Sequence, residues 1–383
     1  MTPLAAAGPA PIALYVHWPF CTRICPYCDF NVVRDRGREA LKARLADAIR
    51  RDIEGHAEVT GPRTLVSVFF GGGTPSLLDP GEAAAILATA RALWPAAADL
   101  EVSLEANPAD VEAGRLEALA AAGVNRLSLG VQSLDDANLA ALGRNHDAAL
   151  ARHAAKIARA AMPRLSLDMI WGLPGQSVSA WARDLEAAIA LQPEHISAYE
   201  LTFEPGTPFD RARQRGRLTP PDEDTRAELY DVTGAMLAEA GFEAYEVSNH
   251  ARGEAARSRH NLVYWRGGDY VGVGPGAHGR VTRGGVRWAT QAPRGVEAYV
   301  ERVGREGSGG VLERLDPRQA ALERLLMGLR TSEGVTLEDL TPLAIEEGRF
   351  QEVRGLAERR DGRLVATPDG RRVLDALIAR LAS

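Results

Sequence analysis

The chain has 383 residues, of which 45% are hydrophobic and 25% are charged. This composition is ordinary for a globular protein and excludes a largely disordered or fibrous chain. The formal net charge of −6 is a poor balance for a protein that binds nucleic acid, because such proteins usually carry a basic patch, so we expect no nucleic-acid partner.

The sequence pattern predicts neither a membrane span nor a secretory signal. No run of about 18 apolar residues is present, so we expect no membrane span. The N-terminal stretch MTPLAAAGPAP lacks the basic region and the long apolar region of a secretory signal. We therefore expect a cytoplasmic protein.

From residue 12 to about residue 245, short apolar runs alternate with segments whose apolar residues recur at helical spacing. Strands that alternate with helices predict βαβ units and a parallel sheet. Six such units are too few for a closed eightfold barrel, so we expect an α/β fold with a partial (β/α)6 barrel over residues 1–248. The expected strands cover residues 12–18, 65–70, 100–105, 125–131, 164–170 and 195–201.

The pattern changes after residue 248. Residues 249–315 are rich in Gly and Arg and poor in helical periodicity, so we expect a connecting region there. From residue 316 a helical pattern returns, and it predicts a small, mostly helical C-terminal domain over residues 316–383.

Three cysteines, Cys21, Cys25 and Cys28, form a CxxxCxxC motif directly after the first expected strand. An odd number within eight residues, in a chain without an export signal, does not indicate a disulfide framework. A structural zinc site with His17 is one alternative, but such sites usually use paired CxxC units. A 4Fe–4S cluster normally takes four cysteines, so three would leave one iron open to a small molecule.

The CxxxCxxC motif, its place after the first strand and the aromatic Tyr27 before the last cysteine resemble the radical S-adenosylmethionine (SAM) superfamily. The resemblance implies a partial (β/α)6 barrel with Cys21, Cys25 and Cys28 as cluster ligands. It also implies that SAM caps the open iron and can be cleaved to a 5′-deoxyadenosyl radical.

The run GGGTP at residues 71–75 ends the second expected strand. It is either a plain turn or a place where backbone approaches a ligand ammonium closely. No Gly-Lys-Ser/Thr follows, so a phosphate loop is not indicated. Glu105, Gln132 and Asp168 stand at or near the ends of later strands, where barrels form their active face, although each could be a cap or a solvated loop residue.

Similarity to the coproporphyrinogen-oxidase branch of the superfamily implies a set of positions that contact SAM. Arg144 among them could pair with a carboxylate through two hydrogen bonds. Thr202 is a weaker match, because the loop around it differs. The implied positions are Tyr15, Tyr27, Gly72, Gly73, Thr74, Glu105, Gln132, Arg144 and Asp168.

The sequence HNLVYW at residues 260–265 lies in the Gly- and Arg-rich stretch, which we expect outside the barrel. A lone histidine beside aromatics is often a packed core group. Histidine is also a common axial ligand of haem, and Tyr264 and Trp265 could pack on a flat macrocycle. The HNxxYW pattern resembles a hallmark of the haem chaperone family HemW, which implies that His260 binds haem iron. His250 and His278 are the rival ligands.

The resemblance extends from residue 14 to the C-terminal helix and has two branches. The oxidase has a fourth cysteine two residues after the third, and Phe30 stands there. We therefore expect a haem chaperone that binds a 4Fe–4S cluster, SAM and haem and delivers haem to an acceptor protein, for which a respiratory or membrane-associated protein is one option. The alternatives are an oxygen-independent coproporphyrinogen III oxidase and a zinc-stabilised binding module.

Overall fold

The computed structural model describes residues 9–383. The expectation about a secretory signal concerns residues that lie mainly outside this range. No helix in the described part has the length and apolar character needed to cross a membrane.

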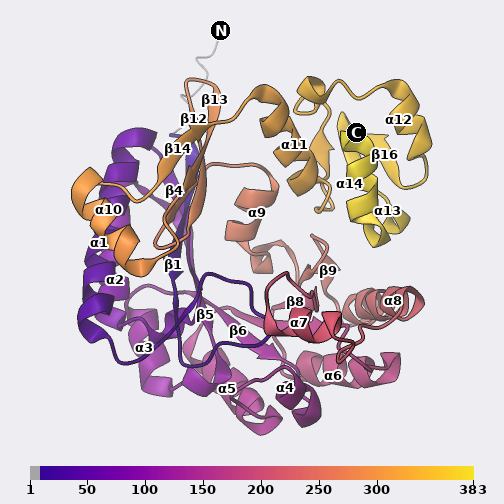
Figure 1. The fold of residues 1–383 in the computed structure, drawn as a ribbon, viewed down its shortest axis with the longest axis horizontal. Coiled ribbons are helices and arrows are strands. Elements are labelled where there is room, and N and C mark those ends of the chain that lie inside the picture. Colours follow the sequence, from indigo (N-terminus) through magenta and orange to yellow (C-terminus); the bar gives the residue numbers. More distant parts are fainter. Residues whose placement is uncertain (1–8) are drawn as a thin grey trace.

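Six parallel strands form the centre of the molecule and lie side by side in chain order. They confirm the predicted βα alternation and the α/β fold class, because helices follow the strands and cover the outer side of the curved sheet (Figure 1). The strands are β1 (Pro11–Trp18), β4 (Thr64–Gly72), β5 (Ala96–Ala106), β6 (Arg126–Gln132), β7 (Leu165–Trp171) and β8 (His195–Glu200). The helices are α1 (Glu39–Thr60), α2 (Pro80–Leu93), α3 (Ala113–Ala121), α4 (Asp136–Ala141), α5 (Ala148–Ala161), α6 (Val178–Ala190), α7 (Pro208–Gln214) and α8 (Glu223–Glu239).

The two faces of these strands differ because side chains alternate along a strand. One face carries apolar residues such as Leu104, which pack against the helices in the main core. The other face carries a series of serines that line an internal cavity: Ser103, Ser128, Ser166 and Ser197. The alternation in LEVSLE, RLSLGV, LSLDMI and HISAYE therefore sets both the apolar core and the polar interior of the barrel.

Residues 249–315 do more than connect. They add strands at both ends of the sheet, so the described residues form a twelve-stranded sheet that runs without interruption through the expected boundary at residue 248. Gly272 lets the strand at residues 270–273 lie close to the strand at residues 278–283, because a Cβ on Gly272 would lie 2.0 Å from the carbonyl oxygen of His278. That residues 1–248 and residues 249–315 are separate domains stays a prediction. The elements of residues 249–315 are β10 (Asn249–Ala251), α9 (Arg259–Trp265), β11 (Tyr270–Val273), β12 (His278–Arg283), β13 (Val286–Gln291), α10 (Val296–Glu306) and β14 (Val311–Arg314). The short strand β9 (Glu243–Ala244), which precedes them, pairs with β10.

The C-terminal region has its own apolar core, to which Leu325, Leu364 and Leu377 belong. It contains the expected helices and, in addition, a three-stranded antiparallel sheet. Its elements are α11 (Pro317–Gly328), β15 (Val335–Thr336), α12 (Glu347–Glu352), β16 (Ala357–Arg360), β17 (Arg363–Ala366), α13 (Pro368–Arg372) and α14 (Leu374–Ala382). In Figure 1 this region, drawn in orange to yellow, lies above α7 and α8.

Candidate functional site

The three cysteines lie on one loop that follows β1 and includes the short strands β2 (Phe20–Cys21) and β3 (Val33–Arg34). Cys21 is buried, whereas Cys25 and Cys28 are half-buried. Burial raises the pKa of Cys21 and of Cys28 to about 11, so these thiols need a bound cation to become thiolates at neutral pH. Within residues 9–383 no three histidine, cysteine or carboxylate side chains are grouped around a position for one metal ion. A cluster of several irons gives each thiolate an iron of its own, and the donor set fits such a group.

Arg144 ties the cysteine loop to the ends of β5 and β6. Its Nη1 donates to Cys25 Sγ at 3.2 Å and to Tyr27 Oη at 3.4 Å. Its Nη2 donates to Asn107 Oδ1 at 3.1 Å and to the carbonyl of Gly130 at 2.9 Å. In the described part of the chain it pairs with no carboxylate, so its fork holds the loop against the barrel.

The glycine run at residues 71–73 packs against the backbone that leads into the cysteine loop. A Cβ on Gly73 would lie 2.7 Å from the backbone of Pro19 and Phe20, and Gly73 N donates to the carbonyl of Trp18 at 2.8 Å. Gly72 has a φ of +113° and donates its N–H to Glu105 Oε2 at 3.0 Å. The run is therefore needed for internal packing, and a direct contact with a ligand remains a prediction.

Glu105 and Asp168 bring two carboxyl groups into the barrel interior. Burial, with a further contribution from the charge of Asp168, raises the pKa of Glu105 to about 7. Burial also raises the pKa of Asp168 to about 6, although Ser128 Oγ donates to both of its carboxylate oxygens. Two carboxyls that repel each other in this way favour a cationic ligand between them.

Gln132 ends β6 with a φ of +68°, a backbone conformation that side chains other than glycine adopt rarely. Such strain is concentrated at ligand sites. Gln132 lines one cavity of about 1520 Å³ together with every SAM position expected from the sequence and with the three cysteines. The structure therefore brings together residues that are spread over 150 positions of the chain: Tyr15, Cys21, Cys25, Tyr27, Cys28, Gly72, Gly73, Thr74, Glu105, Gln132, Arg144 and Asp168.

The HNxxYW motif forms α9, which lies against the inner face of β4. The His260 ring stacks on Phe69 with 5.0 Å between ring centroids. Its Nδ1 is 3.0 Å from Ser67 Oγ, and its Nε2 is 2.6 Å from Tyr264 Oη. The expectation that this motif lies outside the barrel was wrong, because a short helix that follows the barrel strands returns into the interior.

The geometry of His260 bears on its expected role as an iron ligand. Its side chain is 1% exposed, and burial lowers its pKa to about 3, so the ring is neutral. Both ring nitrogens already have hydrogen-bond partners, so an iron would have to displace Ser67 or Tyr264. The axial role of His260 remains a prediction.

The rival histidines differ from His260 and from each other. His250, on β10, is 5% exposed, lines the large cavity and has an Nδ1 without a hydrogen-bond partner. His278, on β12, is exposed and lines a second cavity of about 600 Å³ beside Phe30.

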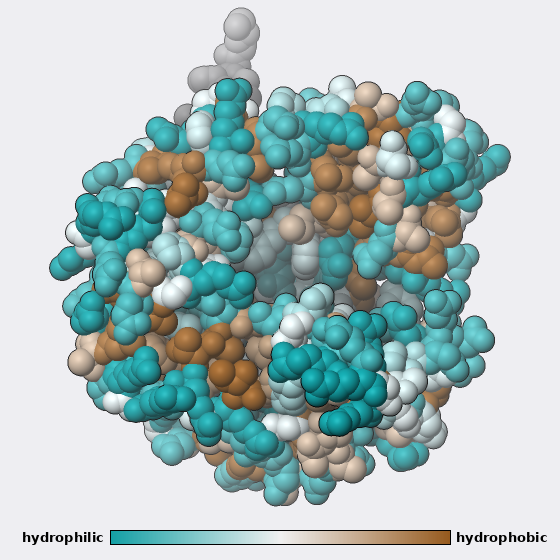
Figure 2. All heavy atoms as spheres, in the orientation of Figure 1, coloured by the Kyte–Doolittle hydropathy of each residue, from teal (hydrophilic) through white to brown (hydrophobic). Residues whose placement is uncertain are grey.

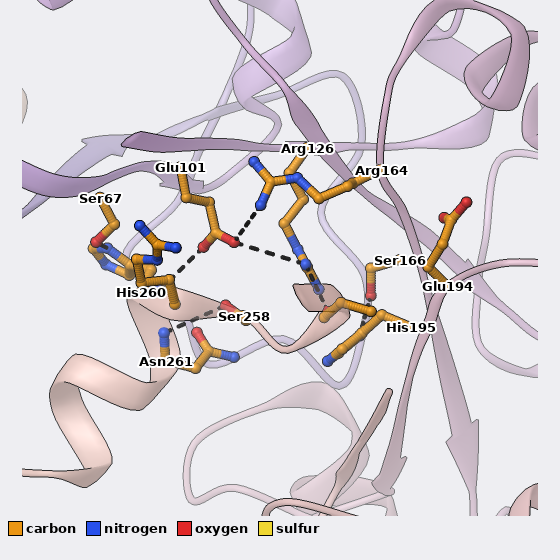
Figure 3. A network of polar contacts seen from close by, with 12 residues as sticks. Ser67, Glu101, Arg126, Arg164, Ser166, Glu194, His195, Ser258, His260 and Asn261 are labelled. Carbon is orange, nitrogen blue, oxygen red and sulfur yellow. Dashed lines mark hydrogen bonds and ion pairs between the residues drawn. The ribbon is translucent and has the colours of Figure 1, made fainter. Parts of the chain in front are cut away.

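A buried polar network at the start of β5 to β8 was missed by sequence reasoning (Figure 3). Glu101 Oε2 lies 3.2 Å from Arg164 Nη1 and 3.7 Å from Arg126 Nη1, and Glu101 Oε1 accepts the backbone N–H of His260 at 3.1 Å. Beside these groups, Ser166 Oγ lies 2.6 Å from His195 Nδ1, and His195 Nε2 lies 2.8 Å from Tyr245 Oη. The one signal in the sequence was a charged residue near the start of a strand, Glu101 in LEVSLE. The network around Glu101, Arg126 and Arg164 is called the floor below. It holds the N-terminus of α9 through the bond from the His260 backbone N–H to Glu101.

Comparison with known proteins shows the family to which the chain belongs. Residues 15–188 match the family model of the Radical SAM superfamily. The chain is 40% identical, over 99% of its length and 89% of the relative, to radical S-adenosyl methionine domain-containing protein 1, mitochondrial, of Bos taurus. It is 41% identical to the protein named heme chaperone HemW of Escherichia coli over 71% of each chain, and 36% identical to heme chaperone HemW of Mycobacterium tuberculosis over 99% of this chain and 96% of that one.

Among solved structures, coproporphyrinogen III oxidase (HemN) of Escherichia coli superposes with a TM-score of 0.81 over 98% of this chain and 91% of that one. At 21% sequence identity this likeness shows a shared fold. The fold and the cysteine loop thus define a member of the radical SAM superfamily. Within it, the chain belongs to the family that contains heme chaperone HemW and the mitochondrial radical SAM domain-containing protein 1.

Proposed function

We propose that this protein is a haem chaperone, which holds a 4Fe–4S cluster and SAM in its barrel, binds haem and transfers it to an acceptor protein. The observation that carries the proposal is the single cavity lined by all three cysteines and all expected SAM positions, in a chain whose relatives include named haem chaperones. The nature of the acceptor and a cytoplasmic location stay predictions.

Cys21, Cys25 and Cys28 would each bind one iron of the cluster. The cluster, when bound, supplies an electron that can cleave the sulfonium bond of SAM. Arg144 positions the loop through its bond to Cys25 Sγ and compensates thiolate charge there. The sequence contains three cysteines, and all three lie on this loop, so no fourth thiol of this chain reaches the cluster. Phe30 stands at the position where the oxidase has its further cysteine, and it is 61% exposed.

The SAM site is proposed on the same cavity wall. Glu105 and Asp168 are the acceptors for the cationic end and the ribose hydroxyls of SAM, and Gln132 can both donate and accept. Tyr15 and Tyr27 supply apolar rings beside these groups. The backbone from Gly72 to Thr74 lies between Glu105 and the cysteine loop, where it can approach the ligand.

The test is anaerobic reconstitution of the full chain, followed by iron and acid-labile sulfide analysis and by haem titration with and without SAM. We expect a stoichiometric 4Fe–4S cluster and a saturable Soret change. In a parallel reaction, coproporphyrinogen III under reducing conditions should give no vinyl product. Product formation without haem binding would establish the oxidase alternative, and zinc without iron or sulfide would establish the binding module.

A further inference from the structure

The cysteine loop borders an open space. On one side it lines the cavity of about 1520 Å³, so the protein can support it only from the other sides. Figure 2 shows a hollow in the surface at the centre of the molecule. The places of the three thiols therefore depend on the contacts that the loop makes away from the cavity.

Cys21 and Cys25 are each held by a contact of their own. Cys21 pairs with Arg34 in the small sheet of β2 and β3, and the N–H of Asp35 donates to the carbonyl of Cys21 at 2.7 Å. Cys25 accepts a hydrogen bond from Arg144 Nη1 at its Sγ, at 3.2 Å. These two cysteines are thus fixed by the sheet and by the arginine.

Cys28 depends on the residues on either side of it. Before it lies Tyr27, whose ring centroid is 6.0 Å from that of Phe209. In the described part of the chain, Asn31 is the first residue after Cys28 that makes hydrogen bonds to a segment outside the loop. The place of Cys28 therefore depends on how firmly Asn31 is held.

Asn31 makes three such hydrogen bonds. Its Nδ2 donates to the carbonyl of Pro275 at 2.8 Å and to that of Arg294 at 2.9 Å, and its own carbonyl accepts from His17 Nε2 at 2.8 Å. A carbonyl oxygen can only accept, so the amide nitrogen has to face both carbonyls and the orientation of the amide is fixed. Gly276, with a φ of +76°, makes room for this amide, because a Cβ there would lie 2.7 Å from Asn31 Nδ2.

The segments that receive the amide are themselves fixed. Gly276 N donates to the carbonyl of Pro293 at 2.8 Å, which joins the two segments to each other. Gly274 N donates to Tyr299 Oη at 2.9 Å, and this hydroxyl donates to the buried Asp52 at 2.7 Å. Tyr299 belongs to the main core, so the amide is bonded to a rigid part of the molecule.

We propose that Asn31 is a positioning residue, which holds Cys28 in place for the cluster by binding the end of the cysteine loop to the carbonyls of Pro275 and Arg294. The proposal rests on the 4Fe–4S cluster of the proposed function and deepens it. Residues that orient metal ligands without touching the metal contribute to its affinity, and their substitution typically weakens binding roughly tenfold to a hundredfold. Asn31 and Arg144 then hold the loop from two different segments.

The first test is Asn31→Asp in the anaerobically reconstituted full chain. This substitution keeps the shape of the side chain but turns an oxygen toward two carbonyl oxygens. The cluster should be held roughly tenfold to a hundredfold less tightly, measured as iron release to a chelator, and the EPR signal of the reduced cluster should change. Asn138→Asp, on α4, adds the same charge at a residue whose printed contact uses only its backbone N–H, and it should match the parent.

The second test needs no cluster. Asn31→Ala removes both donors of the amide and keeps the backbone bond to His17. In the cluster-free full chain, iodoacetamide should then alkylate Cys28 faster than in the parent, while the rate at Cys21 stays unchanged; peptide mass spectrometry reads each site. Circular dichroism reports folding, and Asn31→Ala replaces Asn31→Asp in the first test if the latter fails to fold.

The remaining outcomes separate this role from the general function. If all three cysteines are alkylated faster together, Asn31 stabilises the fold as a whole and is no positioning residue. If the Asn31 variants hold the cluster as the parent does, the proposal is wrong, although the cluster assignment stands. If the parent takes up no cluster, the proposed function fails and the role of Asn31 fails with it.

Discussion

The two ends of the barrel interior differ in how their polar groups are satisfied. At the floor, Glu101 is shared by two arginines and a backbone N–H, and both nitrogens of His260 are hydrogen-bonded. At the cysteine end, loss of solvation raises the pKa values of Cys21 and Cys28 and of the carboxyls of Glu105 and Asp168. A satisfied network holds a structure together, while strained and uncompensated groups indicate where a ligand binds.

The largest effect should come from the cysteine end. Cys25→Ala should lose most of the bound iron and sulfide, because one thiolate of three is missing and the loop then lacks a ligand at its centre. Circular dichroism should remain that of the parent, since the barrel core does not include this side chain. Full iron retention in a variant with all three cysteines replaced by alanine would refute the cluster assignment.

A substitution at the floor should lower the free energy of unfolding and leave the cofactor content unchanged. Glu101→Ala leaves Arg126 and Arg164 without their carboxylate, and breaking a buried ion pair costs roughly 3–5 kcal/mol. Chemical denaturation should show this loss in the free energy of unfolding. Glu347→Ala, which removes the exposed partner of Arg359, is the matched control and should change it little. Equal losses in both variants would contradict the structural role of the floor.

A substitution at Gly73 separates the two roles of the glycine run, which are packing against the cysteine loop and contact with SAM. Gly73→Val places a side chain against the backbone of Pro19 and Phe20, so both cluster content and SAM affinity should fall. The control is Gly114→Val, at a position where a Cβ meets nothing within 4 Å. If Gly73→Val loses SAM affinity but keeps a full cluster, the run contacts SAM directly and its packing role is minor.

The smallest effect should be the pH dependence of SAM affinity. With a pKa of about 7 for Glu105 and about 6 for Asp168, both carboxyls are ionised above pH 7 and become neutral as the pH falls below 6. Affinity for a cationic ligand should therefore be highest above pH 7 and fall toward pH 6. Glu105→Gln should weaken binding by roughly tenfold to a hundredfold and flatten this profile. Glu82→Gln, on the outside of the barrel, should leave the profile unchanged; an unchanged profile in Glu105→Gln would remove Glu105 from the site.

Local patterns in the sequence were sufficient to predict the cysteine loop and the strand order of the barrel. The spacing of Cys21, Cys25 and Cys28, the order of six strands and the alternation of serines with apolar residues all depend on neighbours in the chain, so period and spacing reveal them. The same holds for Glu105, Gln132 and Asp168, because strand ends of a parallel sheet meet at one edge.

Contacts between distant segments decided the rest. Ser67 and His260 are 193 positions apart, and no local period indicates that α9 returns to the inner face of β4. The strands β11 to β14 are short and are separated by segments rich in glycine, so composition alone predicted a connecting region there. The large cavity likewise brings β8 together with α13 of the C-terminal region, more than 100 positions away in the chain. The sequence therefore determined which chemistry the cysteine end can support, whereas only the tertiary structure decided that both ring nitrogens of His260 are hydrogen-bonded to Ser67 and Tyr264, because hydrogen-bond partners are supplied by packing.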